Sequence, residues 1–401
     1  MSINKNTLIM YVLFILSPLL SLPLIFLQLK KKLDKGIIFI FSLFIAILSY
    51  RYIPNLTNDK ARYIERSEMF SNFSFSQLLD YFSLVKRPDF IFDTINFIFS
   101  KLDVSIGFFF FFITFSTVYL SFKFVKLVCE NYFGGKFNFD LLTFSFVLFS
   151  FSLPGIFSGL RFAFAGSIFS LGIYFLLTRE QNPRNIIFSF SLFTLSILTH
   201  FSYIGLFLPV LVILLKMRRI KLNILLIVSI LLLFVAPLTK GYFESILKLI
   251  SLPEGYSNKT SLYLEMENSN TFNSEVLLFV KSLWFYFLPI ILFLDRAKTH
   301  LCPIVIATYF IVCIVSFVDT AFIRYMLFLK LLVVPYLILL LYSGRLKFGF
   351  FFGFFLLYFL GFCIDLLVLR NNILASFTSG MWNIFSIFYD TRASYMNVVG
   401  S

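Results

Sequence analysis

Long apolar runs alternate with short polar segments along almost the whole chain. A helix that crosses a bilayer needs about 20 predominantly apolar residues, so runs of this length are typical of membrane spans. They predict spanning helices over residues 7–29, 36–52, 105–126, 160–178, 222–238, 274–294, 301–318, 321–342 and 348–370. The run 139–153 is shorter and ends at Pro154-Gly155, which leaves a short span and a broken helix as alternatives.

The apolar stretch 186–215 is too long for one span and has His200 in its middle. Two short passes, 186–199 and 201–215, place every short basic loop on one side of the membrane. These loops carry Lys30 to Lys35, Lys123 and Lys126, Arg179 and Arg184, the cluster 216–221, Arg296 and Lys298, and Arg345 and Lys347. Because Lys and Arg concentrate in cytoplasmic loops, that side is the cytoplasm. We expect an all-α polytopic membrane protein with about 12 spans, in a range of 10 to 14, and both termini outside.

Two long polar loops, roughly 53–104 and 239–273, fall outside in this topology. The pieces 76–86 and 89–102 of the first loop are moderately amphipathic, as expected of helices that lie along the membrane interface. Residues 371–401 form a C-terminal tail. With no internal repeat or soluble domain in the pattern, we expect one transmembrane domain over residues 1–401.

The composition supports lipid as the solvent of this chain. Of its 401 residues, 59% are hydrophobic and only 13% are charged, with a mean hydropathy of +0.92. A soluble domain carries about 25% charged residues. The net charge of +14 lies in short loop clusters rather than in one stripe, which argues against nucleic acid. The four cysteines have neither metal-ligand nor disulfide-framework spacing.

Ionisable side chains are costly inside spans and mark polar cavities, partners or pathways. The apolar stretches and their turns contain Arg161, His200, Lys281, Arg324, Lys330 and Asp365. Most of these lie near the outer ends of their predicted spans, under the two long loops, and only Lys330 is clearly deeper.

Each of these groups also has a purely structural interpretation. The arginines can extend to the interface, the histidine can be a satisfied structural residue, and the other three can be partners or cavity lining. In the first loop, Asp59, Arg62, Tyr63 and Asp89 are by default exposed loop residues.

The functional interpretation is an anion site near the outer face. A guanidinium binds phosphate bidentately, so Arg161 and Arg324 indicate a phospholipid headgroup or a polyprenyl pyrophosphate. His200 nearby is suited to act as a general base near neutral pH. Motifs for ATP, NAD or metal binding are lacking in the sequence. We therefore expect no cofactor and no metal, since an activated lipid substrate needs neither.

Four short stretches carry a family resemblance over roughly residues 50–340. They are Asn58 to Tyr63 with Arg87-Pro88-Asp89-Phe90, Ser158 to Ala163, Leu198 to Ser202, and Arg324-Tyr325. These resemble the acidic-tyrosine motif, the Arg-x-Ala helix start, the His-x-Ser turn and the later Arg-Tyr pair of the EpsG family, among the Wzy-type polysaccharide polymerases. Phe162 stands where that family usually has Gln, and Asp59 is separated from Tyr63.

The resemblance implies a glycosyltransferase that polymerises oligosaccharide repeat units linked to undecaprenyl pyrophosphate, on the outer face of the bacterial inner membrane. The product would be O-antigen (lipopolysaccharide), capsule or exopolysaccharide. The transition state should have oxocarbenium character. We hypothesise that His200 is the base, with Asp59 or Asp319 second. Arg161 and Arg324 would hold pyrophosphate, and Arg62, Tyr63 and Tyr325 would complete the substrate-binding set.

The expected partners are lipid-linked glycans, membrane lipids, and a chain-length regulator and a flippase of the same pathway, without nucleic acid. Three alternatives stay open: a lipid-linked oligosaccharide flippase or other transporter, an O-antigen-type ligase, and a membrane scaffold. Transporters place their sites near the bilayer midplane and often show repeated halves. Lys330 and Lys281 favour a transporter, whereas the outward position of the other groups favours the polymerase.

Overall fold

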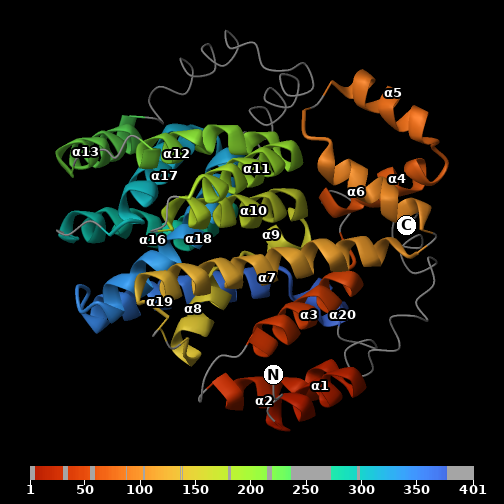
Figure 1. The fold of residues 1–401 in the computed structure, drawn as a ribbon, viewed down its shortest axis with the longest axis horizontal. Helices are drawn as coiled ribbons and strands as arrows, with labels where there is room; N and C mark the ends of the chain where they lie inside the picture. Colours follow the sequence, from red (N-terminus) through yellow and green to blue (C-terminus); the bar gives the residue numbers. More distant parts are fainter. Residues whose placement is uncertain are drawn as a thin grey trace.

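The computed structural model describes residues 5–29, 35–54, 59–86, 88–102, 104–135, 137, 139–178, 182–214, 219–235, 272–295 and 299–376. Within this part of the chain every regular element is a helix and no strand forms, as the sequence predicts (Figure 1).

Among the described residues, five helices are long and apolar enough to cross a membrane. They are α7 (Ile106–Tyr132), α10 (Leu160–Leu177), α16 (Phe272–Leu294), α18 (Asp319–Tyr342) and α19 (Phe348–Val368). Large apolar side chains such as Ile187, Phe234 and Leu367 stay exposed, a surface suited to lipid rather than water. The chain is therefore a multi-pass membrane protein, while the number of 12 spans stays a prediction.

Shorter apolar helices occupy most of the other predicted spans. They are α3 (Lys35–Arg51), α12 (Phe207–Leu214), α13 (Arg219–Val235) and α17 (Cys302–Ile314), which continues into the 3-10 turn η4 (Val315–Phe317). A last short helix, α20 (Arg370–Ser376), follows α19.

The prediction of one helix over residues 7–29 is wrong. The chain forms α1 (Lys5–Leu16) and α2 (Pro18–Leu29), separated by Ser17, and the two helices contact each other. The cause is Pro18, because its ring clashes with the preceding turn and it has no N–H to continue the ladder.

The region 139–157 follows the broken-helix alternative. Helix α8 (Leu141–Ser150) ends before the extended Phe151, and the single turn α9 (Leu153–Phe157) follows. Asp140 and Ser152 are the N-caps of these two helices, accepting hydrogen bonds from the N–H groups of Thr143 and Gly155.

The predicted division at His200 is also present. Helix α11 (Pro183–Thr199) ends at His200, the 3-10 helix η1 (Phe201–Leu206) follows, and α12 continues from it.

The first predicted loop is helical rather than irregular. It contains α4 (Asp59–Ser71), α5 (Phe75–Val85) and α6 (Ile91–Lys101), which lie together at one end of the bundle (Figure 1). The amphipathic pieces 76–86 and 89–102 correspond to α5 and α6, whereas α4 was not expected. The second predicted loop lies outside the described residues as far as position 271.

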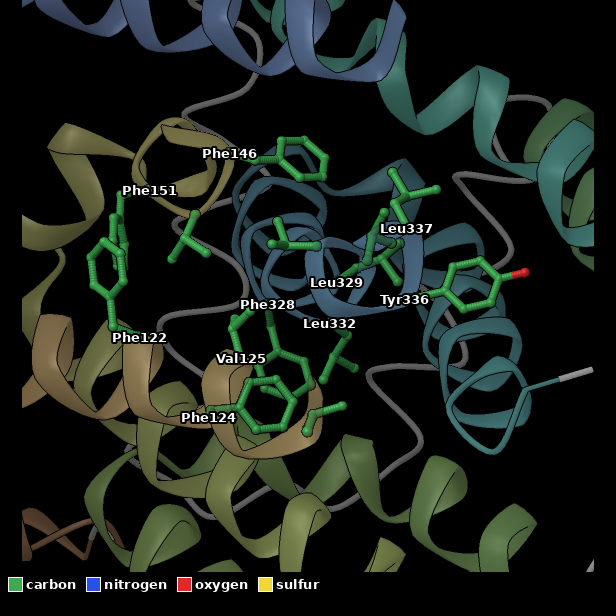
Figure 2. Packing of buried hydrophobic residues seen from close by; sticks show 14 of the residues in the cluster. Phe122, Phe124, Val125, Phe146, Phe151, Phe328, Leu329, Leu332, Tyr336 and Leu337 are labelled. Carbon is green, nitrogen blue, oxygen red and sulfur yellow. The ribbon is translucent and has the colours of Figure 1, made fainter. Parts of the chain in front are cut away.

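Helix α18 lies at the centre of the packing. Phe328, Leu332 and Leu337 are buried along it, and α7 and α8 pack against it through side chains such as Phe124 and Phe146 (Figure 2). An α18 held on several sides is a rigid base for the polar residues at its N-terminal end.

Candidate functional site

Lys60 attaches α4 to the end of α3. Its side chain is 0% exposed, and its ammonium donates to the backbone oxygens of Ser49 at 2.5 Å and Tyr52 at 2.8 Å. The ammonium also lies 4.4 Å from the ring centroid of Phe110. Burial lowers the pKa of Lys60 well below its ordinary value. The carbonyls at the C-terminus of α3 gain a donor in this way, and α4 gains a fixed position.

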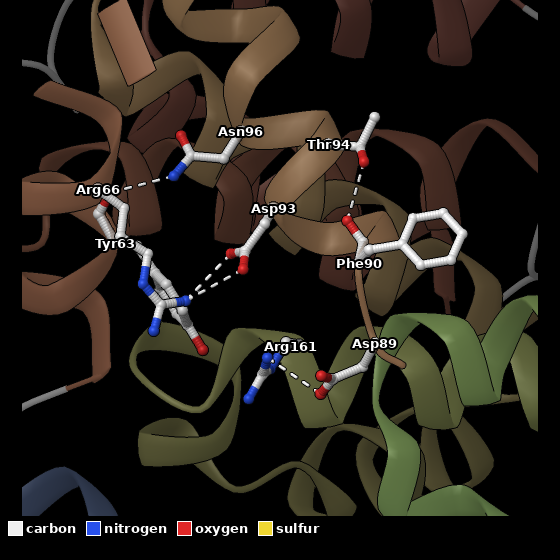
Figure 3. A network of polar contacts seen from close by, with 8 residues as sticks. All are labelled: Tyr63, Arg66, Asp89, Phe90, Asp93, Thr94, Asn96 and Arg161. Carbon is white, nitrogen blue, oxygen red and sulfur yellow. Dashed lines mark hydrogen bonds and ion pairs between the residues drawn. The ribbon is translucent and has the colours of Figure 1, made fainter. Parts of the chain in front are cut away.

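A second set of polar contacts joins α4 to α6. Arg66 donates to both carboxylate oxygens of Asp93, at 3.0 and 3.4 Å, and the amide of Asn96 donates to the backbone oxygen of Tyr63 at 3.1 Å (Figure 3). Helix α5 packs on these two helices through apolar side chains, with Leu78 against Phe70 and Phe97. We call α4, α5 and α6 together the cap helices (residues 59–101).

The cap helices reach α10 through an ion pair between Asp89 and Arg161. Oδ2 of Asp89 lies 3.1 Å from Nη1 of Arg161, with side chains 0% and 11% exposed (Figure 3). The Tyr63 hydroxyl points toward Arg161. Burial raises the pKa of Tyr63 to about 12, even though the positive charge of Arg161 lowers it. Tyr63 is therefore a neutral hydroxyl near pH 7, able to donate a hydrogen bond.

The default assignment of Tyr63 and Asp89 as exposed loop residues is wrong, since both are buried. The reason is that the segment carrying them folds into helices that pack on α7 and α10 rather than remaining in solvent. Arg62, the neighbour of Tyr63 on α4, stays exposed, because adjacent residues of a helix lie on different faces.

Asp59 joins two cations at the start of α4. Its Oδ1 lies 2.5 Å from Nη2 of Arg62, and its Oδ2 lies 3.9 Å from Nη2 of Arg324 at the N-terminal end of α18. The Arg324 side chain is 29% exposed, against 11% for Arg161. A carboxylate between two partly exposed guanidinium groups marks a place that suits a larger anion.

His200 belongs to a separate hydrogen-bonded chain close to these groups. Its Nδ1 lies 2.7 Å from the Ser202 hydroxyl, and the hydroxyl of Tyr325 donates to the Ser202 backbone oxygen. The ring of Phe162 packs edge-on against His200, with centroids 5.3 Å apart. Tyr325 follows Arg324 on α18, so the His200 turn and the Arg324 region are connected through one helix.

A cavity of about 90 Å³ touches each of these groups through one residue, which is Arg324 in the first and Phe162, the neighbour of His200, in the second. Arg324 lines it together with Phe162 and Tyr203, between α7, the α8–α9 break, α10 and α18. Phe162, which stands where the family usually has Gln, therefore lines this cavity and also packs against the His200 ring.

Asp319 lies elsewhere. It begins α18 and lines a different cavity of about 430 Å³, together with Glu275, Ser282 and Tyr286. Its assignment as an alternative base stays a prediction, and the cavity that it lines does not include Arg324.

The broken helix α8–α9 is held by charged residues deeper in the bundle, of which Asp365 and Lys330 are buried and Lys281 is 29% exposed. The ammonium of Lys281 pairs with the carboxylate of Asp365, whose other oxygen accepts the Leu153 N–H at 3.1 Å. Lys330 donates to the Phe149 oxygen at 2.9 Å. Both ends of the break therefore gain a partner from a charged side chain, which agrees with the interpretation of Lys281, Lys330 and Asp365 as structural partners.

The Asp89–Arg161 pair gives a first testable expectation. Because removing one partner leaves a buried charge uncompensated, Asp89→Ala should lower the free energy of unfolding by about 3–5 kcal/mol. Equilibrium unfolding in detergent would measure this loss, and the double variant Asp89→Ala, Arg161→Met should recover part of it. Additive losses in the double variant would show that the two side chains are not coupled.

These features define a polytopic helical membrane protein with an arginine–carboxylate site at one end of its bundle. The EpsG family model matches residues 36–379, and the chain belongs to the EpsG family. That family is associated with Wzy-type polymerases, which indicates a polysaccharide polymerase-type membrane protein. No curated protein and no solved structure matches the chain.

Proposed function

We propose that the protein polymerises oligosaccharide repeat units linked to undecaprenyl pyrophosphate, on the outer face of the bacterial inner membrane. The observation that carries this proposal is the Asp59 carboxylate placed between Arg62 and the partly exposed Arg324, which lines a cavity. A pyrophosphate can take the place of that carboxylate, because both guanidinium groups bind either anion.

In the proposed reaction a sugar hydroxyl of the acceptor attacks the anomeric carbon of the donor glycan. The bond from that carbon to the pyrophosphate oxygen breaks, its electrons stay with the pyrophosphate, and the hydroxyl proton passes to a base. Arg324 stabilises the charge that develops on the leaving group. Since Arg161 is already paired with Asp89, we place it second to Arg324 as a pyrophosphate ligand.

His200 is the first choice for the base, with Asp59 second once pyrophosphate has displaced it from the arginines. Arg62, Tyr63 and Tyr325 complete the proposed substrate-binding set, and the cap helices would then face the outside of the cell. The positions of the short basic loops support this orientation. A flippase that delivers the substrate and a chain-length regulator are the proposed partners, with O-antigen, capsule or exopolysaccharide as product.

A transporter of lipid-linked oligosaccharides is the second candidate, favoured by the charged residues at the α8–α9 break. Discontinuous helices with charged partners are common at transport sites. In this protein, however, Lys281 is paired with Asp365, and Lys330 donates to a backbone oxygen. Both ammonium groups thus have a structural partner, which leaves the polymerase as the better-supported function.

Deletion of the gene in its host, with gel analysis of the surface polysaccharide, tests the function. Collapse of the ladder to a single repeat unit would support polymerisation. Loss of all surface repeats, with lipid-linked units trapped on the cytoplasmic side, would instead identify a flippase. Polymerised chains that stay on the carrier lipid would identify a ligase.

The histidine assignment has a matched control, because the chain has only two histidines. His200→Ala should lower the polymerisation rate by about 10²–10⁴-fold, the usual contribution of a general base. His300→Ala should leave the rate nearly unchanged, since His300 lies beside Tyr132 and Leu339 in a cavity that includes neither Arg324 nor Phe162. Polymerisation by purified protein in liposomes would measure both rates. Near-normal activity of His200→Ala would remove His200 as the base.

A further inference from the structure

The cavity beside Arg324 is apolar in spite of its hydroxyl-bearing residues. Three of them donate their hydroxyl hydrogens to carbonyls of their own helices: Thr117 to Ile113 at 2.8 Å, Ser121 to Thr117 at 2.8 Å, and Ser150 to Val147 at 2.6 Å. The Tyr203 hydroxyl donates to the backbone oxygen of Phe162 at 3.1 Å. These four hydroxyl hydrogens are therefore used within the protein, the Ser152 hydroxyl accepts the Gly155 N–H at 3.4 Å, and most of the remaining surface is apolar.

The cavity follows α18 away from the cation. Arg324 lies at one end, and Leu327, Phe328 and Leu331 continue the same wall for about two helical turns, or roughly 10 Å. Gly155, Gly159 and Ala163 line it from α9 and α10. Small residues of the α9–α10 region and apolar side chains of α18 therefore line a cavity that also has a guanidinium in its wall.

An anionic group followed by a slender apolar chain fits this arrangement. We propose that the cavity receives the part of the lipid chain next to the phosphates, so that it is the binding subsite for the first isoprene units of the carrier lipid. This inference rests on the proposed function. It adds that α9, α10 and α18 select the lipid through its chain, while Arg324 selects it through its charge.

Filling the cavity tests this subsite. Ala163→Leu adds three carbons to a partly exposed wall position. Gly155→Ala is a milder variant, because the new Cβ would lie 3.4 Å from Ser152 Cβ and 3.5 Å from Leu327 Cδ1, in ordinary contact. Gly353→Leu is the matched control on α19, where an added Cβ meets nothing within 4 Å.

Binding to the purified full-length protein would be measured with three probes: polyprenyl pyrophosphate, inorganic pyrophosphate, and vesicles of phosphatidate in phosphatidylcholine. Ala163→Leu should weaken polyprenyl pyrophosphate binding about tenfold, since two or more buried methylenes of the chain are displaced. Gly155→Ala should weaken it less, in the same direction. Inorganic pyrophosphate binding should stay within about twofold of the wild type in both variants, and Gly353→Leu should change nothing.

Three results would overturn the subsite. The first is unchanged binding of polyprenyl pyrophosphate by Ala163→Leu. The second is an equal loss of affinity for inorganic pyrophosphate in that variant. The third is phosphatidate that binds the wild type as tightly as the polyprenyl lipid and loses affinity equally in Ala163→Leu. The last result would assign the cavity to acyl chains of phospholipids. If the wild-type protein binds the polyprenyl lipid selectively but does not polymerise repeat units, the proposed function is wrong and the subsite is still supported.

Discussion

Arg324→Ala should reduce polymerisation by purified protein by at least about 10²-fold, the cost of losing one donor aimed at a developing negative charge. The residue is suited to this role because its guanidinium is partly exposed, lies 3.9 Å from the Asp59 carboxylate and lines the cavity. The loss should appear mainly in kcat, since the charge on pyrophosphate grows as the glycosidic bond breaks. Arg324→Lys should recover only part of the rate, because an ammonium lacks the planar fork.

The control for Arg324 is another arginine of the same chain. Arg345 is exposed between α18 and α19, far along α18 from Arg324, and Arg345→Ala should retain nearly full activity. Arg161→Lys should also lower the polymerisation activity, because an ammonium cannot reproduce the geometry of the guanidinium in its pair with Asp89. Full activity of Arg324→Ala, with normal membrane insertion, would contradict the assignment of Arg324 to the leaving group.

Asp365→Leu should be the most destabilising single change in the membrane part of the molecule. It removes the partner of Lys281 and the acceptor for the Leu153 N–H in one step. Asp365 is buried and the Lys281 side chain is 29% exposed, so we expect a loss of about 3 kcal/mol, the lower end of the cost of breaking a buried ion pair. Equilibrium unfolding in mixed micelles would measure the loss of free energy of unfolding.

Two further variants separate the charge from the hydrogen bond. Asp365→Asn keeps an oxygen for Leu153 and should lose less than Asp365→Leu, while Lys281→Met combined with Asp365→Leu should recover part of the loss. Leu367→Ala is the control, since Leu367 is 63% exposed on the same helix and should change the free energy of unfolding by about 0.5 kcal/mol or less. Equal losses for Asp365→Leu and Leu367→Ala would show that the pair does not hold the α8–α9 break.

Hydropathy alone predicted most of the helices, since lipid forces every spanning segment to satisfy its own backbone. It located the turn at His200, because a histidine between apolar runs is a local feature, and it indicated a broken helix near Pro154-Gly155, where the structure has the break at residues 151–152. It failed at Ser17, where the length of the run 7–29 outweighed Pro18, and it left α4 unassigned because that helix is polar.

The pairing of the polar residues came only from the tertiary structure. The sequence indicated that Arg161, Arg324 and Asp365 have a functional or structural partner, because a charged side chain in an apolar run is costly. It could not indicate that Asp365 contacts Lys281, 84 positions away, or Leu153, 212 positions away. Periodicity specifies neighbours only within about one helical turn, whereas these contacts depend on which helices pack together.

The apolar pattern of this sequence therefore determined that the protein lies in a membrane as a set of helices, and where most of those helices begin and end. Packing decided that Asp89 neutralises Arg161, that Asp59 lies between Arg62 and Arg324, and that a cavity begins at Arg324. The reason is that transfer into lipid is a property of each segment by itself. A binding site requires side chains from several segments to converge.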